Sequence, residues 1–326
     1  MTNLPQPPAA PSRVRLVLSV ALAVLCGCGV ALQTRINGQL GSDLGDGFVA
    51  ALISFGSGLV IITIVLLISP AGRRGVGKVT AAIRAREIPW WHTAGGIGGG
   101  LFVLSQGLVV GLLGIALFTV AAVAGQTVSG LVIDARGIGK VAPKAITITR
   151  ILGAVLALVA VLIAVLPQLS SQANLWTIIF PFGVGLFLGL QQALNGQIKT
   201  LANSATTATF FNFVYGTVLL GIIATVNLVV AGLPHGFPRN PIFYLGGLIG
   251  VLFIAGFAAV IPVIGVLLQS LAAVSGQLLM ALLLDYVAPT SDEPVAIATV
   301  VGTILTLVAV LITSLRSRAV VAARSR

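Results

Sequence analysis

The sequence carries little charge: only 8% of its 326 residues are Asp, Glu, Lys or Arg, against about 25% in soluble domains. Seven acidic residues and two histidines offer few groups for acid–base catalysis. The metalloprotease motif H-E-x-x-H, the hydrolase motif G-x-S-x-G and the nucleotide-binding P-loop do not occur. These absences exclude the enzyme classes that those motifs define, and they predict a protein that is not an enzyme.

Cysteine is equally scarce, with Cys26 and Cys28 the two present. They are two residues apart in an apolar stretch, where a helix points them in different directions and prevents an ordinary disulfide. Neither belongs to a Cys-x-x-Cys pair or to any other spacing typical of metal ligands. We therefore predict no metal site and no cofactor, and expect both side chains to fill apolar space.

Apolar residues dominate what remains, at 57% of the chain, with a mean hydropathy of +1.12. A membrane-spanning helix needs about 20 such residues, and polar positions divide the chain into pieces of that length. The composition predicts an all-α polytopic membrane protein. The expected spans are 16–32, 48–68, 91–110, 115–133, 145–166, 175–194, 206–230, 242–261, 264–284 and 295–315.

Four of these spans are expected to form two hairpins. Residues 91–133 and 242–284 contain no Lys, Arg, Asp or Glu, and each stretch is about twice as long as one crossing requires. Tight turns at 111–114 and 262–265 would divide each stretch in two, because Gly and Pro favour turns. The result is ten crossings, five in each half of the chain.

The two halves repeat one another. Q-T-R-I-N-G-Q at 33–39 returns as Q-Q-A-L-N-G-Q at 191–197, a shift of 158 positions, and a second block repeats at a shift of 151. In the first block Ala50, Phe55 and Gly58 match Ala208, Phe213 and Gly216; in the second Gly95, Gly96, Gln126 and Asp134 match Gly246, Gly247, Gln277 and Asp285. Because each repeat has an odd number of spans, the copies must be inverted relative to each other. Many secondary transporters are built in this way.

Basic residues indicate the orientation, since Lys and Arg accumulate in cytoplasmic loops. With the N-terminus in the cytoplasm, all 18 of them except Arg35 and Arg239 fall on the cytoplasmic side. Both termini are therefore predicted to be cytoplasmic. The net charge of +11 is then an orientation signal with some attraction to anionic lipid, and we predict the lipid bilayer rather than nucleic acid as partner.

The predicted organisation has five parts. A Pro-rich, disordered cytoplasmic tail at 1–14 precedes the first five-helix repeat at 15–166, and a linker at 167–174 leads to the second repeat at 175–315. A basic cytoplasmic tail at 316–326 follows. Residues 16–32 match an internal span of the second repeat, which argues against a cleaved signal peptide. Residues 73–86 are expected to form an amphipathic cytoplasmic segment.

Amides within or beside the apolar spans are the candidate functional residues. Unpaired amides are costly in hydrocarbon, so these side chains must face other helices or a wet cavity. They can act as interhelical hydrogen-bonding groups, worth about 0.6 kcal/mol each, or they can line a substrate path, and both roles stay open. The candidates are Gln33, Asn37 and Gln39, their counterparts Gln191, Asn195 and Gln197, and the pair Gln126 and Gln277.

Other amides and charges complete the set. Gln106, Gln269 and Asn212 lie in spans but have no amide counterpart in the other repeat. Gly38 and Gly196 are expected to serve helix ends. Asp134, Asp285 and Arg150 lie at helix ends, where we expect them to anchor the membrane boundary. No acidic residue lies deep in a span, so a carboxylate that exchanges a proton for a cationic substrate has no clear candidate.

The Gly-rich run G-G-I-G-G-G at 95–100 begins a span instead of following a strand. Close helix packing through small residues therefore explains it better than nucleotide binding. Gly246, Gly247 and Gly250 of the second repeat support that explanation.

The chain resembles the drug/metabolite transporter superfamily, which has an EamA-like fold, and in particular its YdcZ-like branch. The resemblance rests on ten spans in two repeats, on Q-x-x-x-N-G-Q in both halves and on A-x-x-x-x-F-x-x-G in both second spans. The resemblance covers residues 15–315. It implies a multi-pass protein of the bacterial inner membrane that exports small metabolites or toxic compounds.

The predicted function is a secondary transporter of an unknown small-molecule substrate, working by alternating access between two inverted units. A channel or lipid translocator would share the fold, and a membrane subunit with no transport of its own is a further alternative. The sequence carries no signal for an oligomeric state.

Overall fold

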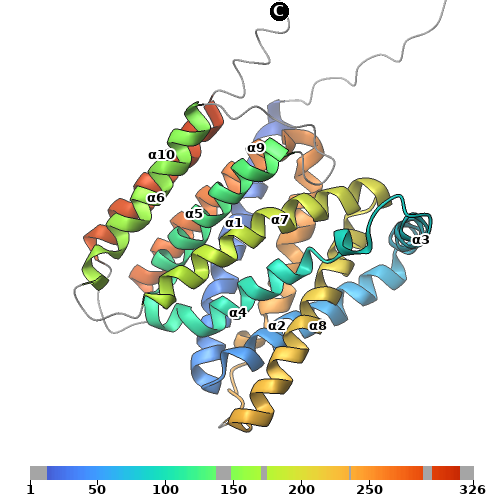
Figure 1. Ribbon diagram of the computed structural model, residues 1–326, viewed down its shortest axis with the longest axis horizontal. Coiled ribbons are helices and arrows are strands. Elements are labelled where there is room, and N and C mark those ends of the chain that lie inside the picture. Colours follow the sequence, from blue (N-terminus) through green and yellow to red (C-terminus); the bar gives the residue numbers. More distant parts are fainter. Residues whose placement is uncertain (1–12, 137–147, 170–174, 235, 289–295, 316–326) are drawn as a thin grey trace, which may run out of the picture.

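The computed structural model describes residues 13–136, 148–169, 175–234, 236–288 and 296–315, which contain no strand (Figure 1). The helices of the first half are α1 (Arg13–Leu44), α2 (Gly47–Ile68), α3 (Pro70–Arg84), η1 (Trp90–Thr93), α4 (Gly96–Leu113), α5 (Ile115–Arg136) and α6 (Ile148–Leu169). Those of the second half are α7 (Trp176–Ala202), α8 (Ala205–Ala231), η2 (Pro241–Tyr244), α9 (Gly246–Val287) and α10 (Ile297–Leu315).

Helix ends follow local chemistry. Asp46 caps α2 by accepting hydrogen bonds from the backbone N–H groups of Phe48 and Val49. Gly114 separates α4 from α5 with a φ of +77°, a conformation that glycine adopts without strain. The predicted turn at 111–114 is thus confirmed.

The first helix of each repeat is longer than predicted. α1 continues past residue 32 to Leu44, and α7 continues past residue 194 to Ala202. The expectation that Gly38 and Gly196 end these helices is therefore wrong. Most of the amides around them form hydrogen bonds within the protein, so their polarity does not force the helix to end.

α9 is helical throughout its 42 residues yet doubles back on itself. A straight helix of that length would place Gly256 and Gly276 about 30 Å apart. In the structure the neighbouring residues Cys26 and Cys28 of α1 reach both of them: the Cys26 sulfur lies against Gly256, and the Cys28 sulfur is 3.6 Å from the carbonyl oxygen of Gly276. The chain therefore reverses between Gly256 and Gly276, a stretch that contains the predicted turn at 262–265. We call the apolar segments on either side, Gly246–Phe257 and Leu271–Val287, the two arms of α9.

Ten apolar helical segments result. Six described helices have the length and hydropathy to cross a membrane, and four shorter apolar segments lie in α6, in the two arms of α9 and in α10. α3 is not among them. The ten expected crossings are confirmed by this count, although they are not the same set as the ten helices α1 to α10.

The repeats are inverted, as predicted. α2 and α8 cross antiparallel at the centre, where Phe55 packs on Gly216 and Phe213 packs on Gly58. Contacts that repeat with the partners exchanged define a two-fold axis. Because the two helices run in opposite directions, this axis is perpendicular to them and lies in the plane of the membrane.

The repeats also interlock. α1 packs against both arms of α9, and α7 packs in the same way against α4 and α5. The close approaches are equivalent: a Cβ on Gly27 would overlap the carbonyl of Ala273, and one on Gly185 would overlap the carbonyl of Ala122. The fifth helices, α6 and α10, pair side by side at one edge of the molecule (Figure 1).

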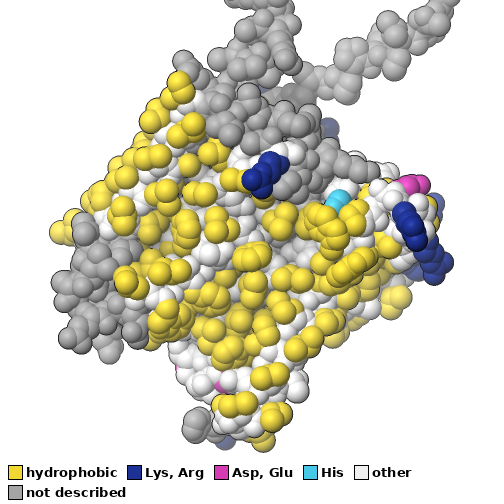
Figure 2. Space-filling model, in the orientation of Figure 1, with side chains coloured by type: hydrophobic (Ala, Val, Ile, Leu, Met, Phe, Trp, Pro, Cys, Tyr) yellow, Lys and Arg dark blue, Asp and Glu magenta, His cyan; other side chains and the backbone are white. Residues whose placement is uncertain are grey.

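α3 is an amphipathic helix that has no counterpart in the second repeat. Its buried face packs on α7 and α8, where the Thr207 hydroxyl donates to the Gly72 carbonyl oxygen over 3.0 Å. Its exposed side carries Arg73, Arg74 and Lys78, and Figure 2 shows basic side chains gathered at this corner beside an otherwise apolar face. We call this side of the molecule the α3 end, and the opposite side, where α9 finishes, the Asp285 end.

Candidate functional site

Four polar side chains form a first amide cluster in the half toward the Asp285 end: Gln33, Thr34, Asn37 and Gln106. Asn37 Nδ2 donates to Gln106 Oε1 over 2.6 Å, and Gln106 Nε2 donates to the Thr34 hydroxyl over 2.9 Å. Gln33 Nε2 donates to the carbonyl oxygen of Gly246 over 2.7 Å. All four side chains are buried, Asn37 and Gln106 completely.

A second amide cluster, made of Gln191, Asn195 and Asn212, lies in the half toward the α3 end. Asn212 Oδ1 accepts from Gln191 Nε2 over 2.8 Å and from Asn195 Nδ2 over 3.1 Å. Asn212 is 1% exposed, whereas Gln191 and Asn195 are half-buried. The second cluster is therefore more accessible than the first.

Glycines at a helix start of the opposite repeat lie directly on each cluster. A Cβ on Gly246 would meet Asn37 Oδ1, and one on Gly95 would meet Asn195 Oδ1 at 3.1 Å. The next glycines, Gly96 and Gly247, leave no room for a side chain beside the backbone of α8 and α2, respectively. The Gly-rich run thus packs helices closely, as predicted, and brings the amide motif of each repeat to the interface between repeats.

Each cluster keeps buried polar atoms without a hydrogen-bond partner among the described residues. In and beside the first cluster these are Asn37 Oδ1 and the Ser54 hydroxyl; in the second they are Gln191 Oε1 and Asn212 Nδ2. Leaving such an atom unpaired costs about 1–3 kcal/mol. Unpaired atoms at the interface of two repeats are therefore candidates for contact with a ligand or with water.

The equivalent glycines Gly38 and Gly196 have different surroundings. A Cβ on Gly38 would lie 2.6 Å from Cγ1 of Val110, and one on Gly41 would overlap the carbonyl of Gly107. No described atom comes within 4 Å of a Cβ placed on Gly196. α1 thus packs closely on α4 at the Asp285 end, while in the described part of the chain α7 has no comparable packing on α9.

Four predicted residues lie outside both clusters. Gln39 accepts from Arg35 over 3.0 Å and donates to Asp43 over 2.6 Å, forming a ladder along α1. Gln197 is 6% exposed, and neither of its amide atoms has a partner among the described residues. Gln126 and Gln277 follow Gly125 and Gly276, the glycines at which α5 crosses α7 and α9 crosses α1.

Asp285 does more than mark a helix end. Its carboxylate accepts hydrogen bonds from the backbone N–H groups of Ile115 at 2.9 Å and Ala116 at 2.6 Å, and so caps α5 of the other repeat. This cap lies at the Gly114 turn and ties the two repeats together. The side chains of Asp134 and Arg150 lie outside the described residues, so their predicted anchoring stays a prediction.

Gln106 and Asn212 hold the centres of the two clusters, although neither belongs to the repeated motifs. Their sequence signal is an isolated amide within an apolar span, which is costly unless it is hydrogen-bonded. A comparison of the two repeats does not identify Gln106 and Asn212, because the equivalent positions hold Phe257 and Ser54 and carry no amide.

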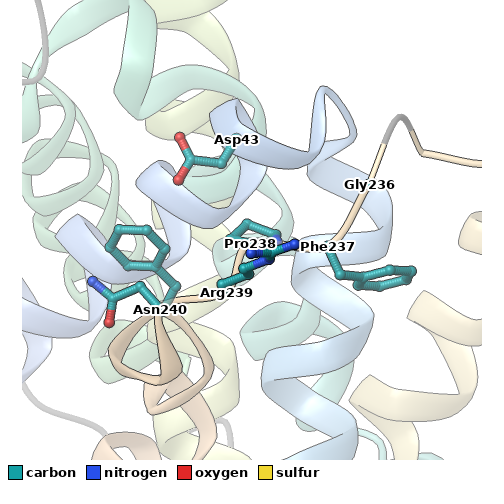
Figure 3. Close-up of a pocket in the computed structure, with 7 residues that line it drawn as sticks. Asp43, Gly236, Phe237, Pro238, Arg239 and Asn240 are labelled. Carbon is teal, nitrogen blue, oxygen red and sulfur yellow. The ribbon is translucent and has the colours of Figure 1, made fainter.

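A surface pocket of about 460 Å³ lies at the Asp285 end, between the last turn of α1 and the segment before η2. It is lined by Asp43, Gly236, Phe237, Pro238, Arg239, Asn240 and Phe243. Figure 3 shows Phe237 pointing away from Asp43, on the segment that borders the pocket. None of the cluster amides lines it.

The fold and the paired clusters define a multi-pass membrane protein built from two inverted five-helix repeats. The sequence profile of the family described as "Putative inner membrane exporter, YdcZ" matches residues 18–163 and 176–312, one match for each repeat. The chain belongs to this family, a branch of the drug/metabolite transporter superfamily, and is a multi-pass inner membrane protein. The resemblance seen in the sequence is thereby confirmed.

Among solved structures, one described only as the crystal structure of a protein matches with a TM-score of 0.52. It is 16% identical, and the match covers 95% of this chain and 99% of that one. At this identity the match supports the fold alone. No curated protein matches the chain.

Proposed function

We propose that this chain is a secondary transporter that exports a small metabolite or drug-like compound by alternating access. The observation that carries the proposal is the difference between Gly38 and Gly196, two positions that the repeat makes equivalent. Two similar units in different arrangements can exchange them, and the exchange would open the Asp285 end while closing the α3 end.

The orientation of the chain in the membrane determines which side the packed Gly38 and the unpacked Gly196 face. With both termini in the cytoplasm, as the basic residues indicate, the α3 end is cytoplasmic and the Asp285 end is periplasmic. The second amide cluster is then accessible from the cytoplasm, while the first is sealed from the periplasm by α1 on α4. An exporter takes up its substrate in this inward-open state.

A channel or lipid translocator is the competing function. A channel needs a path that is open at both ends at once, and the close packing of Gly38 and Gly41 on α4 argues against such a path at the Asp285 end. A rigid, non-transporting subunit gives no reason for the equivalent positions to differ, with Gly38 packed on α4 and no described atom beside Gly196.

A reversible lock on α1 and α4 tests the proposal. The Cβ of Ser42 lies 3.9 Å from the Cβ position of Gly111, close to the separation of about 3.8 Å in disulfides. The variant S42C/G111C, made with Cys26 and Cys28 replaced by Ala, should therefore form a disulfide that holds the Asp285 end shut. Efflux of metabolites from cells producing the protein is followed by mass spectrometry, with empty cells for reference.

We expect oxidation to reduce protein-dependent efflux to the level of empty cells and a reductant to restore it. The matched control is S42C/G56C, in which the second cysteine lies too far along α2 to pair with the first. Full export by the oxidised S42C/G111C variant would show that α1 and α4 need not separate, which would contradict alternating access at the Asp285 end. If no compound leaves the cells faster when the protein is present, it is not an exporter.

A further inference from the structure

We propose that the second amide cluster binds the substrate, and that the substrate is an uncharged molecule presenting a hydrogen-bond acceptor and a donor beside an apolar face, as a primary amide attached to an aromatic ring does. This inference rests on the proposed transport function and adds the substrate class and the site.

The unpaired atoms of the cluster carry the inference. Asn212 uses its Oδ1 twice, for Gln191 and Asn195, and leaves its Nδ2 donor without a partner among the described residues. Gln191 in turn leaves its Oε1 acceptor unpaired. One free donor and one free acceptor on hydrogen-bonded neighbours match a group that both accepts and donates, such as a carboxamide.

The second amide cluster has uncharged surroundings, which favour a ligand without charge. The glycine backbone at the start of α4 lies on the cluster, and both Gln191 Nε2 and the ring of Phe55 border Gly99. No carboxylate, ammonium or guanidinium group takes part in the hydrogen bonds of Gln191, Asn195 and Asn212 that the described residues form. A buried charge requires a counter-charge, so the cluster suits a neutral ligand, whose apolar part would lie toward the buried ring of Phe55.

Access distinguishes this cluster from its counterpart. Gln191 and Asn195 are half-buried, and no described atom fills the space beside Gly196. The first cluster is closed by the contacts of Gly38 and Gly41 with α4. The approach to the second cluster is therefore from the α3 end, past Lys199, which lies one helical turn beyond Asn195. Gln191 Oε1 and Asn212 Nδ2 are themselves buried, so a ligand contacts them only when the half-buried side chains of Gln191 and Asn195 move aside.

Binding is tested on the purified full-length protein with four aromatic probes of similar size: benzamide, methyl benzoate, benzoate and benzylammonium. They present, respectively, a donor with an acceptor, an acceptor alone, an anion and a cation. Saturation binding by calorimetry and the ligand-induced rise in melting temperature are the two measurements. We expect benzamide to bind most tightly, and methyl benzoate to bind more weakly because it cannot donate to Gln191 Oε1.

The variant Asn212→Asp keeps the acceptor for Gln191 and Asn195 but replaces the free donor with an oxygen. We expect it to bind benzamide about tenfold more weakly, the size of one lost hydrogen bond, and to bind benzylammonium more tightly than the unaltered protein does. A merely structural role of Asn212 cannot produce this exchange of preference. Thr306→Ala is the matched control, because the Thr306 hydroxyl donates to the Gly302 carbonyl oxygen within α10, away from the cluster.

The site proposal is overturned if benzamide does not bind, if benzoate binds more tightly than benzamide, or if Asn212→Asp, folded as judged by gel filtration, binds all four probes as the unaltered protein does. Failure of the transport proposal looks different: benzamide binds through Asn212, yet proteoliposomes show no saturable counterflow of any of the probes that bind. Counterflow that is indifferent to Asn212→Asp supports transport and places the site elsewhere.

Discussion

Phe55 of α2 packs on Gly216 of α8 just as Phe213 of α8 packs on Gly58 of α2, and the two ring centroids lie 5.0 Å apart. This reciprocal contact lies on the two-fold axis. It explains the motif A-x-x-x-x-F-x-x-G, because the aromatic ring of one repeat needs the glycine of the other. In the proposed exchange of arrangements, a contact on the axis can persist.

The glycine of this contact should not tolerate a methyl group. A Cβ at position 58 would overlap the ring of Phe213, so we expect Gly58→Ala to lower the free energy of unfolding by about 1–3 kcal/mol, the usual cost of overpacking. Thermal unfolding in detergent measures this. Gly56→Ala, on the same helix with no described atom within 4 Å of its Cβ position, is the control and should not destabilise.

Replacing the ring should rescue the variant. In G58A/F213L the smaller Leu side chain leaves room for the methyl group, so the effects of the two substitutions should be non-additive by at least about 0.5 kcal/mol. Additive effects would show that the ring and the glycine are not in contact.

The Asp285 carboxylate, which caps α5, should contribute more to the stability of the protein than an ordinary surface carboxylate does. Asp285→Ala removes both acceptors of the Ile115 and Ala116 N–H groups, and we expect it to destabilise the protein by about 1–3 kcal/mol. Asp285→Asn keeps one acceptor, so its loss of stability should be smaller than that of Asp285→Ala. Asp43→Ala, an exposed carboxylate at the same end, is compared by the same melting experiment; equal effects of D43A and D285A would refute the cap.

The two motif glycines should respond with opposite signs. Gly38→Ala places a methyl group against Val110 and should destabilise by about 1–3 kcal/mol. Gly196→Ala meets no described atom and gains helix propensity, so it should be neutral or stabilising by up to about 1 kcal/mol. Chemical denaturation of both variants compares them directly, and equal destabilisation would contradict the sealed and open ends.

The orientation of the chain stays a prediction that reporter fusions can check. Since nearly all basic residues fall on one side, we expect green fluorescent protein attached after residue 326 to fluoresce and alkaline phosphatase at the same position to be inactive. An active phosphatase would place the C-terminus in the periplasm and reverse the direction assigned to the open end.

Much of the fold could be predicted from the sequence because its signals are local or repeated. Hydropathy and the missing charges located the spans, and the odd number of spans in each repeat required their inversion. The turn at Gly114 and the reversal within α9 both lie where Gly and Pro interrupt an apolar stretch. The helix ends were less accurate, because amides such as Gln33 and Asn37 resemble a boundary but are paired inside the protein.

The site was only partly predictable. The repeated motif identified Gln33, Asn37, Gln191 and Asn195, and the structure brings the first two to one cluster and the last two to the other. Their partners Gln106 and Asn212 break the repeat, so symmetry could not identify them. The different packing of Gly38 and Gly196 could not be predicted from the sequence, because matching Asn-Gly-Gln motifs give no sign of which glycine packs on a neighbouring helix.

Accessibility of the two clusters to a membrane-impermeant thiol reagent tests alternating access most directly. In protein lacking Cys26 and Cys28, we expect Gly196→Cys to react from the cytoplasmic side and Ser54→Cys, buried near the first cluster, to react from the periplasmic side. Closing the S42C/G111C disulfide before labelling should abolish the second reaction and increase the first. Ser54→Cys reacting equally with the lock open or closed, or never reacting, would contradict alternating access.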